Sequence, residues 1–470
     1  PLEPQRVAIM AGVQRQRATA EIAPARRCAY AVLRRVFERG AYAEEALRAE
    51  CADSDPRDRA LAMRLSYGAI QRRATLDHLI SGLAERPAEQ LDPPLLAALR
   101  LGLYELLYLG GAPDYAVVAD AVELAKGQAR AGHGLVNAVL RRAAREGADA
   151  LLGGLSDGTP ELAALKHSHP EWIARLWWEQ LGPEAARALM AADNEPGEVA
   201  LRANTLRTDA GSLAVELPVR THADPEIPEA LVLEEPFDMH ASPLWQEGSF
   251  IAQSRAAMLV SHALAPLAGE RVLDLCAAPG GKSTHLAALM EGSGQVLAVE
   301  RNRRRAGELA ASAQRLGASN VTVEVGDAAS PRGEGAVFDR VLVDPPCSGL
   351  GTLQARADLR WRMTPGALRE MAGEQARILA SGAGALRPGG VLVYSTCTIS
   401  ATENERLIAA FLDSHPDFGI DDLARERPRF AAGGAAAGAS AAQGIRERCL
   451  LTLPHRDRTA GFFIARLRRS

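Results

Sequence analysis

Lysine is almost absent from the 470 residues of this chain. Only Lys126, Lys166 and Lys282 occur beside 51 arginines, so the arginine excess follows the overall composition and indicates no particular partner. The formal net charge of -4 gives no global sign of a polyanion partner either. A local basic face is enough to bind phosphates, so a nucleic-acid partner stays possible.

Paired cysteines and long apolar runs are missing as well. The six cysteines lie far apart, with no C-x-x-C pair and no nearby histidine at zinc-ligand spacing, so we expect no bound metal and no disulfides. No apolar run reaches the roughly 18–20 residues of a membrane helix, and the N-terminus shows no secretory apolar region. We therefore expect a cytoplasmic protein with free thiols and no membrane association.

The length favours two or three domains, and the sequence changes character twice. Residues 1–150 carry apolar residues at three- and four-residue spacing, which predicts a helical bundle. Residues 151–240 combine amphipathic helices with short strand patterns broken by prolines, which predicts a small α+β module. Residues 241–470 alternate strand and helix patterns, which predicts an α/β domain with a doubly wound, mainly parallel sheet.

The strands of the third domain are predicted from near-continuous apolar runs. These runs are RVLDLCA, QVLAVE, NVTVEVGD, FDRVLVDPP and GGVLVYSTCT, and helical stretches such as RRRAGELAASAQRL lie between most of them. CLLTLPH and GFFIARLRR then predict a closing pair of strands. The Ala/Gly-rich segment at 431–444 is expected to be a surface loop.

A glycine-rich turn, Asp274–Ser283, follows the first of these strands with the sequence DLCAAPGGKS. In a doubly wound sheet, ligands bind beyond the carboxyl ends of the strands at such a turn, because glycine lets the backbone approach the ligand. The turn ends like a phosphate-binding loop, but that pattern needs glycine where this chain has Cys276. No G-x-G-x-x-G dinucleotide fingerprint is present.

Acidic residues follow the second and third strands. Glu300 ends the second strand, where a carboxylate can accept hydrogen bonds from ribose hydroxyls, and Asp327 follows the third, where it can pair with an adenine edge. Each acid alone is a weak signal, because most acids at strand ends are simply solvated. The turn and the two acids in this order predict a nucleoside ligand without a diphosphate, which S-adenosylmethionine fits better than a dinucleotide.

Two cysteines lie at the ends of neighbouring strands. Strand four ends as LVDPPCSGLG, whose paired prolines stiffen the backbone and hold Asp344 and Cys347 at the carboxyl edge of the sheet. Strand five ends on Cys397 and lies beside strand four in the usual strand order, so the two thiols should face one cleft. A free cysteine is more often a small core residue, but two strand-end thiols beside a cofactor-type turn favour a chemical function.

These motifs resemble those of the RNA cytosine-C5 methyltransferases, specifically the bacterial small-subunit (16S) ribosomal RNA enzymes of the RsmB/NOP family. DLCAAPGGKS is similar to the family's cofactor loop, DPPCSGLGT to its first cysteine motif and STCTISATENE to its second. The helical N-terminal region is similar to the NusB-like RNA-binding domain of this group. LRANTLRT and GSFIAQSRAAML are similar to the segments before its catalytic domain.

The resemblance implies a Rossmann-like S-adenosylmethionine-dependent methyltransferase domain behind a NusB-like domain and a small linker module. The implied activity is methylation of C5 of a cytosine in 16S ribosomal RNA through a covalent adduct. We also expect the protein to be a monomer. Cys397 is then the nucleophile, Cys347 helps to release the product and Asp344 supports the base. The implied cofactor-binding residues are Cys276, Ala277, Ala278, Pro279, Gly280, Gly281, Lys282, Glu300, Asp327 and Asp344, with Arg305 supporting Glu300.

Two positions depart from the family's pattern, and two other interpretations stay open. Ser254 and Ala460 each stand where the family usually has aspartate, outside the implied site. An exocyclic-amino methyltransferase also presents D-P-P at strand four, but it continues with an aromatic residue where this chain has Cys347. An RNA-binding ribosome assembly factor with a vestigial methyltransferase fold is the non-enzymatic alternative, and the intact cofactor turn with both cysteines argues against it.

Overall fold

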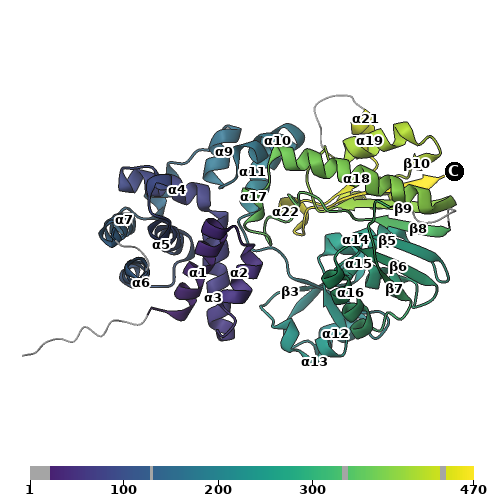
Figure 1. The fold of residues 1–470 in the computed structure, drawn as a ribbon, viewed down its shortest axis with the longest axis horizontal. Coiled ribbons are helices and arrows are strands. Elements are labelled where there is room, and N and C mark those ends of the chain that lie inside the picture. The colour runs from purple at the N-terminus through teal and green to yellow at the C-terminus, as the bar shows by residue number, and fades with distance from the viewer. Residues whose placement is uncertain (1–21, 128–130, 331–336, 434–440) are drawn as a thin grey trace, which may run out of the picture. The chain divides into compact units, whose positions relative to one another are not determined.

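The structure, a computed structural model, describes residues 22–127, 131–330, 337–433 and 441–470 (Figure 1). The chain forms two compact units. Of the described residues, one unit contains those up to Ala69 together with Leu79–Ala150, and the other contains Ile70–His78 and those from Leu151 to Ser470. Among the described residues, no helix has both the length and the apolar character that crossing a membrane requires.

The described part of the first unit is helical, as the apolar spacing predicts. Pro93 opens one helix, and Gly110 follows the π-helical turn that continues it. The first 21 residues of the predicted domain lie outside the described residues. Three helices, α3, α4 and α8, also include residues of the second unit. The helices are α1 (Pro24–Arg39), α2 (Ala43–Glu50), α3 (Pro56–Gln71), α4 (Arg73–Ala84), α5 (Pro93–Tyr104), η2 (Glu105–Leu109), α6 (Asp114–Lys126), α7 (His133–Glu146) and α8 (Ala148–Gly153), with the short turn η1 (Ala88–Gln90).

The second unit begins with helices and a small antiparallel sheet, ordered β2-β3-β1-β4. These elements are α9 (Pro160–Lys166), α10 (Glu171–Leu181), α11 (Pro183–Ala192), β1 (Ala200–Ala203), α12 (Ala210–Glu216), β2 (Thr221–Asp224), β3 (Ile227–Leu233), η3 (Met239–Ala241), α13 (Pro243–Gln246) and β4 (Phe250–Ala252). The α+β module is thus present. Its fourth strand lies beyond residue 240, so the domain boundaries at 150 and 240 stay predictions.

The second sheet carries the predicted site. Its strand order is β7-β6-β5-β8-β9-β12-β10, with β11 paired to β12. The strands from β7 to β9 are parallel and β12 runs antiparallel to β9, which confirms the predicted topology and the closing pair. The bounds are β5 (Arg271–Leu275), β6 (Gln295–Glu300), β7 (Val321–Val325), β8 (Phe338–Val343), β9 (Leu386–Thr396), β10 (Phe418–Ile420), β11 (Leu450–Leu451) and β12 (Phe463–Arg469).

Helices cover both faces of this sheet, because successive strand residues point to opposite sides. Leu273 and Val341 pack in one apolar core with Leu379 of α18, whereas Val272 and Leu342 pack in another core that includes α14. Part of the Ala/Gly-rich segment, residues 434–440, lies outside the described residues. The helices are α14 (Arg255–Leu264), α15 (Gly281–Leu289), α16 (Arg303–Leu316), α17 (Leu359–Arg362), α18 (Pro365–Ala385), α19 (Glu405–Ser414), α20 (Leu423–Glu426), η4 (Pro428–Phe430), α21 (Ala441–Arg446) and α22 (Pro454–Asp457).

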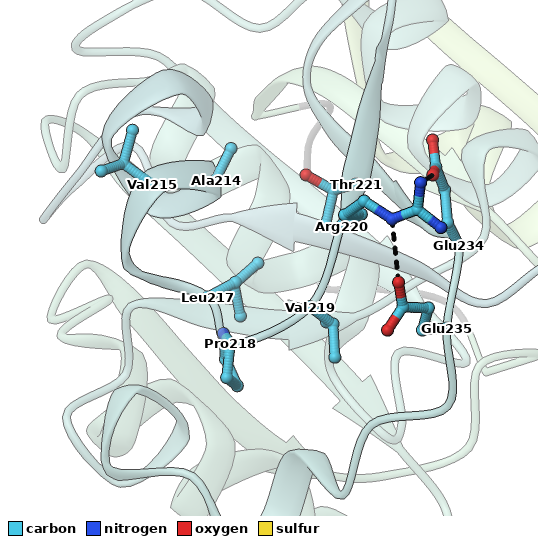
Figure 2. A pocket seen from close by; sticks show the side chains of 9 residues that line it. All are labelled: Ala214, Val215, Leu217, Pro218, Val219, Arg220, Thr221, Glu234 and Glu235. Atoms are coloured by element: carbon cyan, nitrogen blue, oxygen red, sulfur yellow. Dashed lines mark hydrogen bonds and ion pairs between the residues drawn. The ribbon is translucent and has the colours of Figure 1, made fainter.

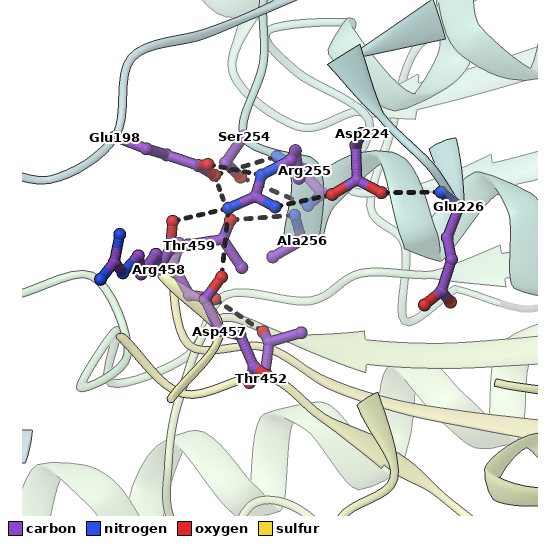
Figure 3. A network of polar contacts seen from close by, with 12 residues as sticks. Glu198, Asp224, Glu226, Ser254, Arg255, Ala256, Thr452, Asp457, Arg458 and Thr459 are labelled. Atoms are coloured by element: carbon purple, nitrogen blue, oxygen red, sulfur yellow. Dashed lines mark hydrogen bonds and ion pairs between the residues drawn. The ribbon is translucent and has the colours of Figure 1, made fainter. Parts of the chain in front are cut away.

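A buried arginine joins the small module to the larger sheet domain. Figure 3 shows Arg255, at the start of α14, between the carboxylates of Glu198 and Asp224. It donates hydrogen bonds to both at 2.6 Å, and also to the backbone oxygens of Asp457 and Arg458 near the C-terminus. The side chain of Arg255 is only 8% exposed, so its charge depends on these partners.

Arg255→Leu should destabilise the second unit, because Glu198 and Asp224 would keep buried charges without a partner. Breaking a buried pair in this way costs about 3–5 kcal/mol. The matched control is Arg304→Leu, since Arg304 pairs with Glu308 on the exposed surface of α16 and should matter little. Urea unfolding measures both variants, and equal shifts of the two midpoints would contradict the assignment.

Candidate functional site

The glycine-rich turn connects β5 to α15 at the carboxyl edge of the sheet. Gly280 has a φ of 100°, and a Cβ there would lie 2.9 Å from Cγ of Leu309, so a larger residue would be both strained and crowded. The Ala277 N–H donates to the Val299 carbonyl at 2.9 Å and fixes the turn to β6. Among the other predicted residues of the turn, Ala278 is buried, Cys276 and Lys282 are half-buried and Pro279 is exposed.

Arg202, on β1, donates hydrogen bonds to the end of this turn and to the first residues of α15. Its guanidinium donates to the Gly281 carbonyl at 2.5 Å, to Oε1 of Gln253 at 2.6 Å and to Oγ1 of Thr284 at 3.0 Å. Burial lowers the pKa of Arg202 to about 9. Sequence reasoning missed this residue, although it lies within the segment LRANTLRT.

Glu300 and Asp327 lie at the ends of β6 and β7, as predicted. The buried carboxylate of Glu300 accepts the Asn302 N–H at 2.8 Å and lies 3.6 Å from the Arg305 guanidinium. Arg305 also donates to the Ala278 carbonyl at 2.8 Å, so it joins the acid to the turn. Asp327 is exposed and its side chain accepts a backbone N–H two residues ahead.

Asp344 follows β8 and has a partner on each carboxylate oxygen. Lys282 Nζ donates to Oδ2 at 2.7 Å, and Ser395 Oγ donates to Oδ1 at 2.8 Å. The Lys282 ammonium also lies 5.1 Å from the ring centre of Phe462. Although burial opposes it, the charge of Asp344 raises the pKa of Lys282, which therefore stays cationic at neutral pH.

The two predicted thiols meet at the ends of β8 and β9. The Sγ atoms of Cys347 and Cys397 lie 3.3 Å apart, and the Gly351 N–H donates to the Cys397 carbonyl at 3.0 Å. The hydrogen bond from Cys347 lowers the pKa of Cys397 despite burial, and the charges of Arg356 and Lys282 act in the same direction. The same hydrogen bond, together with burial, raises the pKa of Cys347 well above its usual range. Cys397 is therefore the thiol that ionises more readily.

A buried polar network fixes the neighbours of both thiols. Oε1 of Glu403 accepts the Ser348 N–H at 2.8 Å and the Gln375 amide at 2.9 Å, and the Tyr394 hydroxyl donates to the Glu403 carbonyl at 2.7 Å. Ser348 and Thr398, the residues after the two cysteines, share a hydrogen bond at 2.6 Å. Ser348 lies within DPPCSGLGT, and Thr398 and Glu403 lie within STCTISATENE, but the motifs alone did not predict that these residues contact one another.

Models of three protein families match successive parts of the chain. The NusB family model matches residues 23–145, and the ferredoxin-like domain of RsmF/B-like methyltransferases matches residues 169–240. The model described as 16S rRNA methyltransferase RsmB/F matches residues 261–468, which include the turn and both thiols.

Similarity to known proteins extends over nearly the whole chain. A probable ribosomal RNA small subunit methyltransferase B of Synechocystis sp. is 35% identical over 95% of this chain and 99% of that protein. The chain belongs to the RsmB/F family of 16S rRNA methyltransferases. A Bacillus subtilis protein of the same printed name is 34% identical over 88% of this chain and 91% of that protein.

The solved structure of PH0851 has the same fold, with a TM-score of 0.76 and 26% identity over 95% of this chain and 99% of that one. The fold predicted from the motifs is thereby confirmed. As a member of the RsmB/F family, the chain is an S-adenosylmethionine-dependent RNA methyltransferase.

The residues at the two positions that depart from the RsmB/F pattern each make a local hydrogen bond. Ser254 caps α14, since its hydroxyl accepts the Ala257 N–H at 3.3 Å, and serine is as good a helix cap as aspartate. The Ala460 carbonyl accepts the Thr452 hydroxyl at 2.6 Å, a contact that needs no acidic side chain. Neither of these two hydrogen bonds involves the thiols or the turn.

A separate hollow of about 730 Å³ lies in the small module (Figure 2). It is lined by Ala214, Val215, Leu217, Pro218, Val219, Arg220, Thr221, Glu234 and Glu235. None of the predicted site residues lines it, and Arg220 is already paired with Glu235 at 2.9 Å. The hollow is therefore distinct from the site at the sheet edge.

Iodoacetamide should alkylate Cys397 faster than Cys347 at neutral pH, because the thiolate is the reactive form. The pH midpoint of Cys397 alkylation should lie below that of an ordinary thiol. Lys282→Met should move this midpoint to higher pH, whereas Lys126→Met, on the surface of α6, should leave it unchanged. Peptide mass spectrometry over a pH series measures both rates, and faster labelling of Cys347 throughout would reverse the assignment.

Proposed function

We propose that the chain is a 16S rRNA (cytosine-C5)-methyltransferase that works through a covalent cysteine adduct. The observation that carries this proposal is the pair of thiols, Cys347 and Cys397, with Sγ atoms 3.3 Å apart at adjacent strand ends. C5 of cytosine is a poor nucleophile until a thiolate adds to C6, so C5 methylation requires a thiol at the base. The names of the relatives and the NusB family match support ribosomal RNA as the substrate.

The residues around the turn fit S-adenosylmethionine. Glycine at 280 keeps the turn free of a Cβ that would collide with Leu309, and one buried oxygen of Asp274 has no hydrogen-bond partner among the described residues. When bound, the cofactor supplies an electrophilic methyl group on its sulfonium. We infer that it is held by the turn residues Cys276, Ala277, Ala278, Pro279, Gly280, Gly281 and Lys282, by Glu300 and Asp327 at the strand ends, and by Asp344.

Cys397 makes the first bond of the proposed reaction. Its thiolate gives an electron pair to C6, and the displaced π electrons make C5 nucleophilic while negative charge spreads towards N3. A bound cofactor would supply the methyl group to C5, and the adduct held by Cys397 would then be neutral. The charges of Lys282 and Arg356 favour the starting thiolate.

Cys347 is placed to complete the reaction. It begins as a thiol, because the thiolate character of Cys397 raises its pKa. Once Cys397 is bound to C6 its charge is gone, so Cys347 can lose its proton to solvent and act as a base. It then takes the proton from C5 as the C6–S bond breaks, and Cys397 leaves as a thiolate.

Asp344 is placed to orient the base. Its carboxylate is fixed by Lys282 and Ser395, and its remaining lone pairs can accept a hydrogen bond from the exocyclic amine of cytosine.

The proposed site requires neither a second chain nor a metal ion. The thiols and Asp344 come from one chain, so we infer that a monomer suffices, and the proposed steps use no metal ion at the thiols. The target base has to be unstacked to reach Cys397, which favours a loop or a locally opened helix.

Cys397→Ala should abolish methylation, because no thiolate would then add to C6. Cys347→Ala should trap a covalent RNA–protein adduct that withstands a denaturing gel, since the adduct forms but is not resolved. The test uses full-length chain, radiolabelled S-adenosylmethionine and 16S RNA, with 5-methylcytosine mapped in the product. Cys449→Ala, at a buried cysteine just before β11, is the control and should retain activity.

Full activity of Cys397→Ala would exclude the covalent mechanism. Methylated cytosine carrying the label on the exocyclic nitrogen would indicate an amino methyltransferase. If the wild-type chain binds the RNA but not the cofactor, it acts as an assembly factor.

Gly280→Ala should weaken S-adenosylmethionine binding at least tenfold, because the added Cβ would meet Leu309 and strain a backbone with positive φ. Gly373→Ala is the matched control, because this helical glycine has open space around it and should tolerate the methyl group. Calorimetric titration of the cofactor compares them, and an unchanged affinity for Gly280→Ala would exclude the turn as the binding surface.

A further inference from the structure

Three potential metal ligands from separate elements meet beside α15, the helix that follows the cofactor turn. Glu229 lies on β3, His262 on α14 and His285 on α15, and their ligand atoms are within 4.8 Å of one another. Oε1 of Glu229 is 2.7 Å from Nε2 of each histidine. Glu229 and His285 are buried and His262 is half-buried, so this is no solvated surface cluster.

The two histidines meet Glu229 in different ways. Nε2 of His262 has the geometry of a hydrogen bond to Oε1 of Glu229. Nε2 of His285 is equally close but makes no hydrogen bond, and neither ring nitrogen of His285 has a hydrogen-bond partner among the described residues. A buried nitrogen without a partner is costly, and a cation shared with Glu229 would give Nε2 of His285 a partner.

We propose that Glu229, His262 and His285 form a binding site for a zinc-like divalent cation. Two imidazole nitrogens and one carboxylate are a ligand set that zinc commonly uses, whereas calcium and magnesium prefer sites built from oxygen. A fourth position is left for water. The absence of close cysteine and histidine spacing in the sequence does not bear on such a site, since its ligands come from three separate elements.

The protonation states suit this ligand set. Burial lowers the pKa of His285 to about 3, so its ring is neutral and free to bind at physiological pH. Burial opposes ionisation of Glu229, but the two nearby histidines outweigh it and lower its pKa. The nearby charge of Arg202 also lowers the pKa of His285, which favours the neutral ring that a cation requires.

The site would connect the small sheet to the cofactor turn. His285 lies one turn of helix after Gly281, and Arg202 joins β1 to the same turn. A cation held by Glu229 and His285 would therefore fix β3 to the helix that follows the turn. Its function is structural, and it is independent of the proposed C5 chemistry.

The test measures metal content and affinity in the full-length chain with any histidine tag removed. Chelator-treated protein is titrated with zinc against a chromophoric indicator. We expect one zinc ion per chain. His262→Gln and Glu229→Gln should lower the affinity roughly a hundredfold or more, because each removes a ligand. His222→Gln is the control, since this exposed histidine lies on β2 outside the cluster.

Cobalt binding to the wild-type chain gives a second measurement that needs no variant. The visible spectrum should show the bands of four-coordinate cobalt without the thiolate charge-transfer absorption that binding at Cys347 and Cys397 would add. Absence of these bands, or an equal loss of affinity in His222→Gln and His262→Gln, would overturn the proposal. The cluster would then be a hydrogen-bonded pair of Glu229 and His262 with His285 packed against it.

Discussion

The parallel pairing of β8 with β9 is the constraint on which the site depends. Val343 is aligned with Tyr394, so both strands leave the sheet at the same level. The paired prolines then carry the chain to Cys347, and three residues after Tyr394 the neighbouring strand reaches Cys397. A slip of one residue would turn one thiol to the opposite face of the sheet and separate the pair. Register, and not any contact of the thiols themselves, therefore brings two reactive groups together.

The loops that carry Cys347 and Cys397 contain buried polar groups. Each of these groups needs a hydrogen-bond partner for the two loops to pack together. Glu403 meets this need, because its carboxylate and carbonyl accept hydrogen bonds from Ser348, Gln375 and Tyr394. In a low dielectric such a network is strong when complete and costly when one member is lost. The motif around Cys397 thus includes structural residues, and a change at Glu403 would displace both thiols without touching either.

Sequence periodicity predicted the elements of the sheet domain closely. RRRAGELAASAQRL coincides with α16 and QVLAVE with β6, and the usual strand order placed Cys397 beside Cys347. The contacts that sequence reasoning missed join elements distant in the chain. Arg202 reaches the cofactor turn from β1, and the histidine cluster draws on three elements, so neither leaves a local spacing pattern. The fourth strand of the small sheet was missed because three residues are too few to show alternation.

Buried arginines connect separate segments of this lysine-poor chain through hydrogen bonds. Arg202, Arg255 and Arg360 are all buried, and each donates to backbone carbonyls as well as to side chains. The planar guanidinium offers five donors in fixed directions, so one side chain can satisfy oxygens from several segments at once. An ammonium in the same place would leave some of these oxygens unpaired. Although the number of arginines indicates nothing about partners, at these three positions arginine has a geometric function that lysine could not replace.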